Sequence, residues 1–307
     1  MKYCDAVFEG GGMRGIGLVG ACLAFERAGY KFRRIAGSSA GAIVASLIAA
    51  GYTAEEMYQE MKDINFKAFK HRAHGIGPIG MFIGANKNFG LYSTDVFEKW
   101  LEELLARKNV HTFADVGDRL KITASDITDE KVLTLPDDLA KFGIDTGTFK
   151  ITTAVRMSMS IPVFYEPYAL KDANGNVHYI VDGGLLSNYP VWILDNGTKK
   201  LNVPVFGFRF THHCGMNKSK RANLFSYVKQ VVTTIIEAHD DEYQAVMRGD
   251  AERTIYIDTM VGDKVVGITD FDLAPELIED LFNNGQSVAD TFLSSWDFKK
   301  WTKKFRK

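Results

Sequence analysis

The stretch Tyr3–Leu18, YCDAVFEGGGMRGIGL, begins as a short apolar run, passes through three consecutive glycines and an arginine, and becomes apolar again. The run before the glycines predicts a strand, and the residues after them predict a helix that extends to about Ala28. A second strand is expected at Phe32–Ala36, followed by GSSAG at 37–41 and a helix that ends near Gly51. This strand–helix–strand–helix opening predicts a parallel α/β sheet.

The rest of the chain continues this alternation with one interruption. Thr53 and Glu56 have the spacing of a capping box at the start of another helix. The segment 64–92 is rich in glycine and phenylalanine, and it predicts either a lid beside a pocket or an irregular surface insertion. No linker is evident, so we expect a single domain over 1–307. The further expected elements are a helix capped by Ser93–Thr94, strands near Leu120–Ala124 and Lys131–Leu135, a helix near Thr152–Ser158, a strand pair near Val163–Tyr168 and Val177–Val181, a strand at Val203–Phe210, and helices at Ala222–Met247 and Pro275–Leu293.

Composition and charge exclude several classes of protein. The 307 residues carry a formal net charge of −1, which gives no electrostatic reason to bind nucleic acid. The three cysteines, Cys4, Cys22 and Cys214, have no CxxC spacing, which argues against a disulfide framework or a zinc site and fits a reducing compartment. Neither a signal peptide nor an apolar run of about 20 residues is visible. We therefore expect a cytoplasmic protein that can visit a membrane surface.

The glycine loop first invites a nucleotide-binding interpretation. Gly10, Gly12 and Gly15 match G-x-G-x-x-G between a strand and a helix, as a dinucleotide fingerprint requires. Such a unit also needs an acidic residue at the end of the second strand to bind the ribose, and no Asp or Glu occurs from Ala28 to Gly51. No G-K-[ST] follows the glycines either. The sequence therefore argues against a nucleotide-binding site at the glycine loop.

The second strand ends instead in a pattern typical of a nucleophile elbow. Gly37 and Gly41 flank Ser39 as G-x-S-x-G. A sharp strand-to-helix turn leaves no room for Cβ atoms two residues before or after the nucleophile, and it exposes the serine at a helix N-terminus that favours negative charge. The alternative is an ordinary glycine turn before a helix.

The elbow changes the interpretation of the glycine loop. In a parallel sheet the loops after two adjacent strands emerge at the same edge, so Gly10–Arg14 should lie beside Ser39. Glycines expose backbone N–H groups, and the cation of Arg14 would reinforce them. The loop then resembles an oxyanion hole, in which each donor contributes roughly 3–4 kcal/mol to transition-state stabilisation.

A nucleophilic serine needs a base. None of the seven histidines lies in an evident catalytic motif. Asp182, in VDGG at 181–184, follows an apolar strand, and Gly183 and Gly184 leave it accessible. The alternative is a β-turn of the Asp-Gly type. An Asp with an ordinary pKa of about 3.9 is a weak base at neutral pH, so we expect burial to raise the pKa of Asp182.

Together, GGGMRG at 10–15, GSSAG at 37–41 and DGG at 182–184 resemble the patatin-like phospholipases, and SMSIPVFYEP at 158–167 and NFGLYSTDVFEKWLEELL at 88–105 are similar to that family too. The resemblance implies a three-layer α/β/α fold with a mainly parallel central sheet, of the lysophospholipase and acyl-carrier-transacylase type. It also implies a Ser–Asp dyad without histidine, cofactor or metal. Its site residues, transferred to this sequence, are the nucleophile Ser39, the base Asp182, and an oxyanion hole from Gly10, Gly11, Gly12 and Met13 supported by Arg14.

The function implied is a lipid acyl hydrolase of the phospholipase A or lysophospholipase type. Its substrate would be a phospholipid, a lysophospholipid or another fatty-acyl ester. Two alternatives remain: a serine acyltransferase, and a non-catalytic module that binds lipid or a partner on the same fold. His212-His213-Cys214 has poor geometry for a metal site.

The tail 294–307 combines aromatic and basic residues. A helix there would place Phe298, Trp301 and Phe305 on one face, with lysines over most of the rest. Such a helix can lie in a membrane interface. Alternatively, its aromatic face packs on the core of the protein itself.

Overall fold

The structure is a computed structural model that describes residues 1–64, 66–70, 89–197, 200–211, 213, 227–228, 230–236 and 248–306. Its central sheet consists of β1 (Lys2–Phe8), β2 (Tyr30–Ser38), β4 (Leu120–Asp126), β5 (Lys131–Leu135), β7 (Tyr168–Lys171), β8 (Val177–Asp182), β9 (Val205–Phe210) and β10 (Thr254–Ile257). Two small ribbons pair β3 (Gly90–Tyr92) with β6 (Val163–Tyr165) and β11 (Met260–Val261) with β12 (Lys264–Val265).

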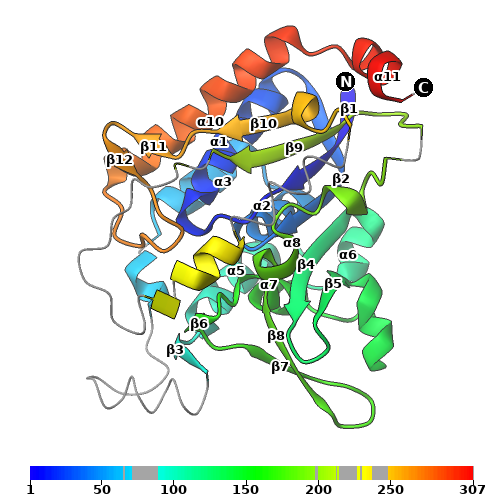
Figure 1. Ribbon diagram of the computed structural model, residues 1–307, viewed down its shortest axis with the longest axis vertical. Helices are drawn as coiled ribbons and strands as arrows, with labels where there is room; N and C mark the ends of the chain where they lie inside the picture. Colours follow the sequence, from blue (N-terminus) through cyan, green and yellow to red (C-terminus); the bar gives the residue numbers. More distant parts are fainter. Residues whose placement is uncertain are drawn as a thin grey trace.

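The sheet is mainly parallel. Its order is β10-β9-β1-β2-β4-β8-β7, and β5 pairs with β4 off this path (Figure 1). The strands from β10 to β4 run parallel to one another, whereas β5, β8 and β7 join by antiparallel pairing. The parallel strands therefore end together at one edge of the sheet, as the opening of the sequence predicts.

Helices flank this sheet (Figure 1). The α-helices are α1 (Gly15–Arg27), α2 (Ala40–Ala49), α3 (Ala54–Lys62), α5 (Asp95–Arg107), α6 (Phe113–Val116), α7 (Ile151–Met159), α8 (Gly184–Ser187), α10 (Pro275–Ser295) and α11 (Phe298–Phe305), and short 3-10 turns occur at Gly12–Arg14, Phe66–Phe69, Gly117–Arg119, Asp137–Phe142, Val191–Ile193 and Ala251–Arg253. The capping box of Thr53 and Glu56 at the start of α3 is confirmed. Within the described residues no helix combines the length and the apolar character that a bilayer crossing requires.

The hydrophobic clusters on the two faces of the sheet differ in size. Along β1, Ala6 and Phe8 point into the large core, whereas Val7 points into a smaller cluster on the other face. The smaller cluster is completed by Tyr189, Val191 and Leu194, from the segment that follows α8. The architecture is thus three layers, with a thick helical layer on one face and a thin one on the other.

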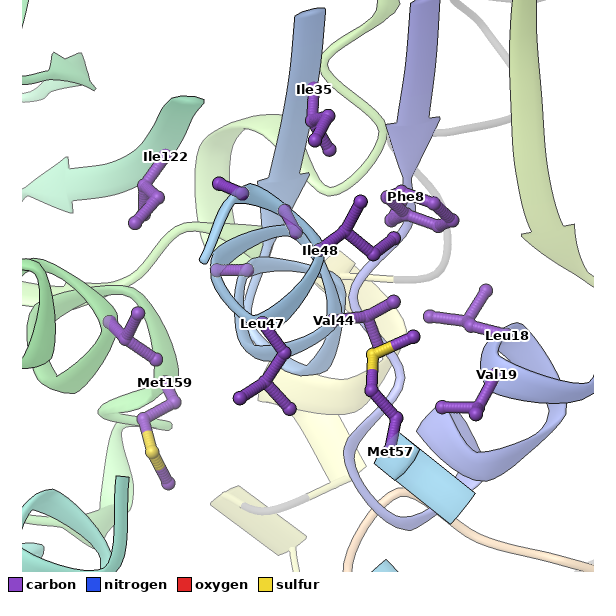
Figure 2. Close-up of a cluster of buried hydrophobic side chains, with 14 of the residues drawn as sticks. Phe8, Leu18, Val19, Ile35, Val44, Leu47, Ile48, Met57, Ile122 and Met159 are labelled. Carbon is purple, nitrogen blue, oxygen red and sulfur yellow. The ribbon is translucent and has the colours of Figure 1, made fainter. Parts of the chain in front are cut away.

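Helix α2 lies in the middle of the thick layer. Its sequence AGAIVASLIA carries no charged residue, and nearly every position is buried. It is therefore enclosed by protein on all sides. Figure 2 shows Val44, Leu47 and Ile48 of this helix among side chains of the sheet and of neighbouring helices: Phe8, Ile35 and Ile122 from the strands, Leu18 and Val19 from α1, Met57 from α3 and Met159 from α7.

Glycines bring α1 and α10 into close contact. A Cβ at Gly20 would lie 1.9 Å from the carbonyl oxygen of Phe282, and a Cβ at Gly285 would lie 1.9 Å from that of Gly17. Close helix packing therefore explains why positions 20 and 285 are glycine.

Three sequence-based expectations need revision or restriction. The expected strand Val163–Tyr168 is divided between two strands: β6 pairs with β3, and only β7, which begins at Tyr168 and extends to Lys171, forms the hairpin with β8. The helix expected over Ala222–Met247 is described as helical only at 227–228 and 230–236. Most of the predicted lid, 71–88, lies outside the described residues, so the lid stays a prediction.

The C-terminal tail packs on the protein itself, which was the alternative to a membrane anchor. Trp301 is 5% exposed, and its indole Nε1–H donates to the Gly249 carbonyl at 2.8 Å. The guanidinium of Arg306 lies 4.8 Å from the Trp301 ring and donates to Asp195 at 2.6 Å. Figure 1 places α11 near the start of β1, at the end of the molecule away from α2. The central residue of the aromatic face of α11 therefore packs on the protein itself, with Phe298 and Phe305 half-buried on either side of it.

The close contact of α1 with α10 predicts that Gly285→Ala is destabilising. The added methyl group meets backbone, which cannot rotate away, so we expect the free energy of unfolding to fall by about 1–3 kcal/mol. Urea denaturation measures this change. Gly147→Ala is the matched control, because a Cβ there meets only ordinary contacts beyond 3.4 Å and should change stability by less than about 1 kcal/mol. Equal stability of the two variants would contradict the packing interpretation.

Candidate active site

The site lies where two strands meet end to end on the same edge of β4. Ser38, the last residue of β2, pairs with Thr123, and Asp182, the last residue of β8, pairs with Ala124, the next residue along β4. The other edge of β4 is occupied by β5. Because β2 and β8 run toward each other, the turn after one strand faces the end of the other. This pairing brings together Ser39 and Asp182, which are 143 residues apart in the sequence.

Ser39 occupies a strained elbow between β2 and α2. Its backbone has φ 50° and ψ −121°, a conformation that non-glycine residues rarely adopt. The two flanking glycines permit this turn. A Cβ at Gly37 would lie 2.3 Å from the Gly41 carbonyl oxygen, and a Cβ at Gly41 would lie 2.2 Å from the Phe8 carbonyl oxygen. The structure therefore gives Gly37 and Gly41 the steric role that the sequence pattern predicts.

The Ser39 hydroxyl donates a hydrogen bond to Asp182 Oδ2 at 2.7 Å. The other carboxylate oxygen, Oδ1, accepts the Gly184 N–H at 2.7 Å. Ser39 is 5% exposed and Asp182 is 1% exposed. Burial raises the pKa of Asp182 from 3.8 to about 7, against the opposing effect of these two hydrogen bonds. The direction of this shift is the one that the sequence analysis expects from burial.

The end of α7 holds both sides of the pair. The Ser158 hydroxyl accepts the backbone N–H of Ser39 at 2.8 Å, and the Ser158 carbonyl accepts the N–H of Gly183 at 3.0 Å. The Ser160 carbonyl accepts the N–H of Asp182 at 2.9 Å. The backbones that carry the nucleophile and the carboxylate are thus fixed to one short segment of a third element.

The glycine loop lies directly beside the elbow. A Cβ at Gly10 would lie 3.0 Å from Ser39 Cβ. The backbone N–H groups of Gly10, Met13 and Arg14 donate to the carbonyls of residues 188, 268 and 11, respectively. Those of Gly11 and Gly12 have no acceptor among the described residues. Gly12 has φ +55°, and a Cβ there would lie 2.0 Å from the carbonyl oxygen of residue 268, which explains the glycine.

Arg14 and Met13 both contact the C-terminal part of the chain. The Arg14 guanidinium is buried, and its Nε–H donates to the Val266 carbonyl at 2.8 Å, which ties the loop to the segment after β12. The Met13 side chain lines the pocket, but its amide is engaged with Ile268. The available donors in this loop are therefore Gly11 and Gly12.

Ser39 lines an apolar pocket whose interior, counted together with the solvent space at its mouth, is about 740 Å³. Nearly all of the side chains around it are aliphatic or aromatic. They include Ile64, Phe66 and Phe69 from the described part of the segment 64–92, Ile43, Met61, Phe97, Trp100, Met159, Ile161 and Tyr165 from the flanking helices, a loop and β6, and Ile268, Phe271, Leu273 and Ile278 from the C-terminal part of the chain.

Two of the described histidines, His178 and His213, are paired with carboxylates elsewhere. His178 Nδ1 lies 2.9 Å from Asp126 Oδ2, and His213 Nε2 lies 2.7 Å from Asp258 Oδ1. Within the described part of the chain, no histidine is hydrogen-bonded to Ser39. His212 and Cys214 lie outside the described residues. Of the predicted motif HHC, the structure therefore shows only that His213 is paired with a carboxylate.

Sequence reasoning missed several residues of the site. Ser158 lies in a segment that the sequence marks only by resemblance, and no spacing rule reveals its bond to Ser39. The pocket walls from α5 and from 268–278 come from elements whose position depends on the tertiary fold. Their apolar periodicity predicts burial but cannot distinguish a core from a cavity wall.

Comparison with known proteins agrees with this geometry. The Patatin-like phospholipase family model matches residues 6–195, a range that contains Ser39, Asp182 and the glycine loop. Uncharacterized protein YqhO of Bacillus subtilis (strain 168) is 35% identical over 300 residues, which are 96% of this chain and 100% of that protein. Probable lipid hydrolase 463L of Invertebrate iridescent virus 6 is 26% identical over 203 residues, 62% of each chain. Among solved structures, VipD from Legionella pneumophila has a similar fold with a TM-score of 0.57 at 17% identity, over 96% of this chain and 67% of that one.

The raised pKa of Asp182 predicts a pH-dependent stability cost. Between about pH 4 and pH 7 the unfolded chain has released the proton of this carboxyl while the folded state still holds it, so stability falls as pH rises through that window. Asp182→Asn removes the titration. We expect this variant to be more stable than the parent protein at pH 8 and to lose that advantage near pH 4, as measured by chemical denaturation.

Asp5→Asn is the opposing control. Although Asp5 is buried, hydrogen bonds and ion pairs with Arg33 and Arg34 lower its pKa. Its substitution should therefore destabilise the protein more at pH 8 than near pH 3. If Asp182→Asn changes the free energy of unfolding by the same amount at pH 4 and at pH 8, that result would contradict the raised pKa of Asp182.

Proposed function

The chain belongs to the patatin-like phospholipase family, and from that premise we propose that it is a lipid acyl hydrolase that cleaves carboxylic esters through an acyl-enzyme on Ser39. The observation that carries the proposal is the 2.7 Å hydrogen bond from the Ser39 hydroxyl to Asp182 beside an apolar pocket. The name of the viral relative, a probable lipid hydrolase, supports the same class of substrate.

In the first step Asp182 accepts the hydroxyl proton as Ser39 Oγ attacks the ester carbonyl carbon. A carboxylate with a pKa of about 7 is ionised enough at neutral pH to accept the proton and basic enough to hold it. The strained elbow supports this step because it presents Oγ at the start of α2 in a fixed orientation. No histidine is required.

The oxyanion of the tetrahedral intermediate would be stabilised by backbone donors. The N–H groups of Gly11 and Gly12 are the candidates from the glycine loop. The first N–H of α2, at Ala40, has no acceptor within its own helix and lies in the pocket wall, so it is a further candidate. Collapse of the intermediate breaks the ester C–O bond; the departing alkoxide takes the proton from Asp182 and leaves as the alcohol, and the acyl group stays on Ser39. Asp182, ionised again, then accepts a proton from the water molecule that attacks the acyl-enzyme, and it returns this proton to Ser39 Oγ as the carboxylic acid is released.

The pocket supports a fatty-acyl substrate. Its aliphatic and aromatic lining offers few hydrogen bonds to a sugar, a peptide or a nucleotide, whereas it can surround a hydrocarbon chain. Phospholipids, lysophospholipids and simpler fatty-acyl esters all fit this description. The proposal therefore specifies a fatty-acyl ester as the substrate and leaves its head group open.

Substitution of the dyad tests the proposal directly. We expect Ser39→Ala and Asp182→Asn each to reduce fatty-acid release from phospholipid or lysophospholipid vesicles by at least about 1,000-fold, because the nucleophile and its base act as a unit. Ser38→Ala is the matched control, since it changes the neighbouring serine of the same elbow and should retain activity within a few-fold. Undiminished release by Ser39→Ala would refute the assignment, and a parent protein inactive on every ester would favour a binding role.

The base predicts the pH profile. With Asp182 titrating near pH 7, kcat/KM on a non-ionising ester should fall about tenfold per unit below that pH and level off above it. Stopped assays from pH 4 to pH 9 measure this limb. A rate that stays constant down to pH 5 would mean that a group with an ordinary carboxyl pKa, or none, controls the reaction.

If the apolar pocket binds the acyl chain, a bulky residue in its wall should impair long-chain esters more than short ones. Ile43 lies one turn after Ser39 on α2 and lines the pocket, so Ile43→Trp should obstruct the chain next to the nucleophile. We expect kcat/KM for a dodecanoyl ester to fall at least about tenfold more than that for an acetyl ester. Ile127→Trp, at an exposed position outside the pocket, controls for the added indole. Equal losses on both esters would place the acyl chain elsewhere.

A further inference from the structure

Asn188 is buried beside the dyad, and the proposed chemistry does not use it. It is 2% exposed and caps the C-terminus of α8, the short helix that begins two residues after Asp182. Its position is therefore fixed relative to the carboxylate by one turn of helix. No metal, charge or catalytic pattern in the sequence marks it.

Asn188 pairs twice with the first residue of the glycine loop. The Gly10 N–H donates to the Asn188 carbonyl at 3.1 Å, and the Asn188 side-chain Nδ2 donates to the Gly10 carbonyl at 3.2 Å. Both backbone polar groups of Gly10 are thus satisfied by a single residue that is 178 positions away in the sequence. A side-chain amide can make this reciprocal contact because it carries a donor, and a hydrocarbon of similar size cannot.

The same amide fills the space left by two glycines. Asn188 Oδ1 lies 2.3 Å from the point that a Cβ on Gly10 would occupy and 2.6 Å from the corresponding point on Gly184. Gly184 in turn donates its N–H to Asp182 Oδ1. One side chain therefore touches the start of the glycine loop and the end of the DGG segment.

We propose that Asn188 is a positioning residue that holds the glycine loop in register with the Ser39–Asp182 pair. This inference rests on the proposed function. The loop is anchored at two ends: Asn188 fixes Gly10, and the carbonyls of Val266 and Ile268 fix Arg14 and Met13. Gly11 and Gly12, the candidate oxyanion donors, lie between these anchors. Preorganised donors stabilise an oxyanion only if they are held at the correct distance from the nucleophile.

Substitution of Asn188 by alanine removes the side-chain half of the first anchor and leaves the backbone bond from the Gly10 N–H, and it should affect the transition state more than substrate binding. For Asn188→Ala we expect kcat to fall by roughly 100-fold, the loss associated with a displacement of about 1 Å near the reacting atoms, while KM for a short-chain ester changes less than about threefold. The Ki of a trifluoromethyl ketone with the same acyl chain, whose adduct with Ser39 carries an oxyanion, should rise by the same factor as kcat/KM falls.

Asn284→Ala is the matched control. The Asn284 side chain also donates Nδ2 to backbone carbonyls, those of Asp258 and Met260, but it does not line the pocket. It should lose stability to a similar extent and retain kcat. Thermal unfolding of each variant separates loss of fold from loss of positioning.

A double-mutant cycle keeps the inference testable if Asn188→Ala folds poorly. Gly10→Ala places a methyl group against Asn188 Oδ1, and Asn188→Ala removes that oxygen. If the two residues act as a unit, the double variant should be less impaired than the product of the two single losses predicts. Strictly multiplicative losses would overturn the pairing.

The outcomes distinguish this inference from the function on which it rests. Parent activity that Ser39→Ala abolishes, together with a selective loss of kcat in Asn188→Ala, supports both. Parent activity with Asn188→Ala indistinguishable from Asn284→Ala in kcat and Ki overturns only the positioning role. Activity that survives Ser39→Ala, or a parent protein that neither hydrolyses esters nor binds the ketone, overturns the proposed function and the inference with it.

Discussion

The pairing of β4 with two strands that approach each other along one edge is the constraint on which the site depends. β2 arrives parallel and β8 arrives antiparallel, and their last residues pair with consecutive residues of β4. Backbone hydrogen bonds to the single strand β4 thus bring the backbones of Ser39 and Asp182 close together, independently of their side chains. The elbow strain, the bonds from the end of α7 and the contacts of Asn188 with Gly10 all act on groups that this pairing has already brought together.

Burial raises the basicity of Asp182 on which the proposed mechanism relies, and it also makes the site costly to fold. An apolar helix, α2, and an apolar pocket surround the pair, so the Asp182 carboxylate loses hydration that two hydrogen bonds only partly replace. The resulting pKa of about 7 suits a base at neutral pH, but the ionised form destabilises the folded state. A more exposed carboxylate would be easier to accommodate and a weaker base. Glycine at positions 10, 37, 41 and 184 makes the required close contacts possible, because a Cβ at each would overlap neighbouring atoms.

Local signals predicted the first half of the molecule well. The run of strand, glycine loop, helix, strand and elbow corresponds to β1, α1, β2 and α2, and the α3 cap followed from Thr53 and Glu56. The prediction was wrong where apolar runs are short: Val163–Tyr168 contains parts of two strands that pair with different partners. β10 at Thr254–Ile257 was missed, since a buried parallel strand of four residues has no alternation to detect. The sequence left two interpretations of the C-terminal helix open, because amphipathicity does not tell whether the apolar face meets lipid or protein; the structure shows that Trp301 of this face packs on protein.

The sequence by itself determined which residues could perform the chemistry, because glycine, serine and aspartate at fixed local spacings have conformational and chemical properties that other residues lack. It also determined the α/β class, since alternating periodicities depend only on neighbours along the chain. The tertiary structure decided what depends on distant segments: the end-to-end meeting of β2 and β8, the engagement of the Met13 amide by Ile268, and the bonds of Ser158 and Asn188. It also decided the pocket, whose walls come from segments as far apart as 12 and 278. Each of these contacts joins groups whose separation in space has no counterpart in their spacing along the sequence.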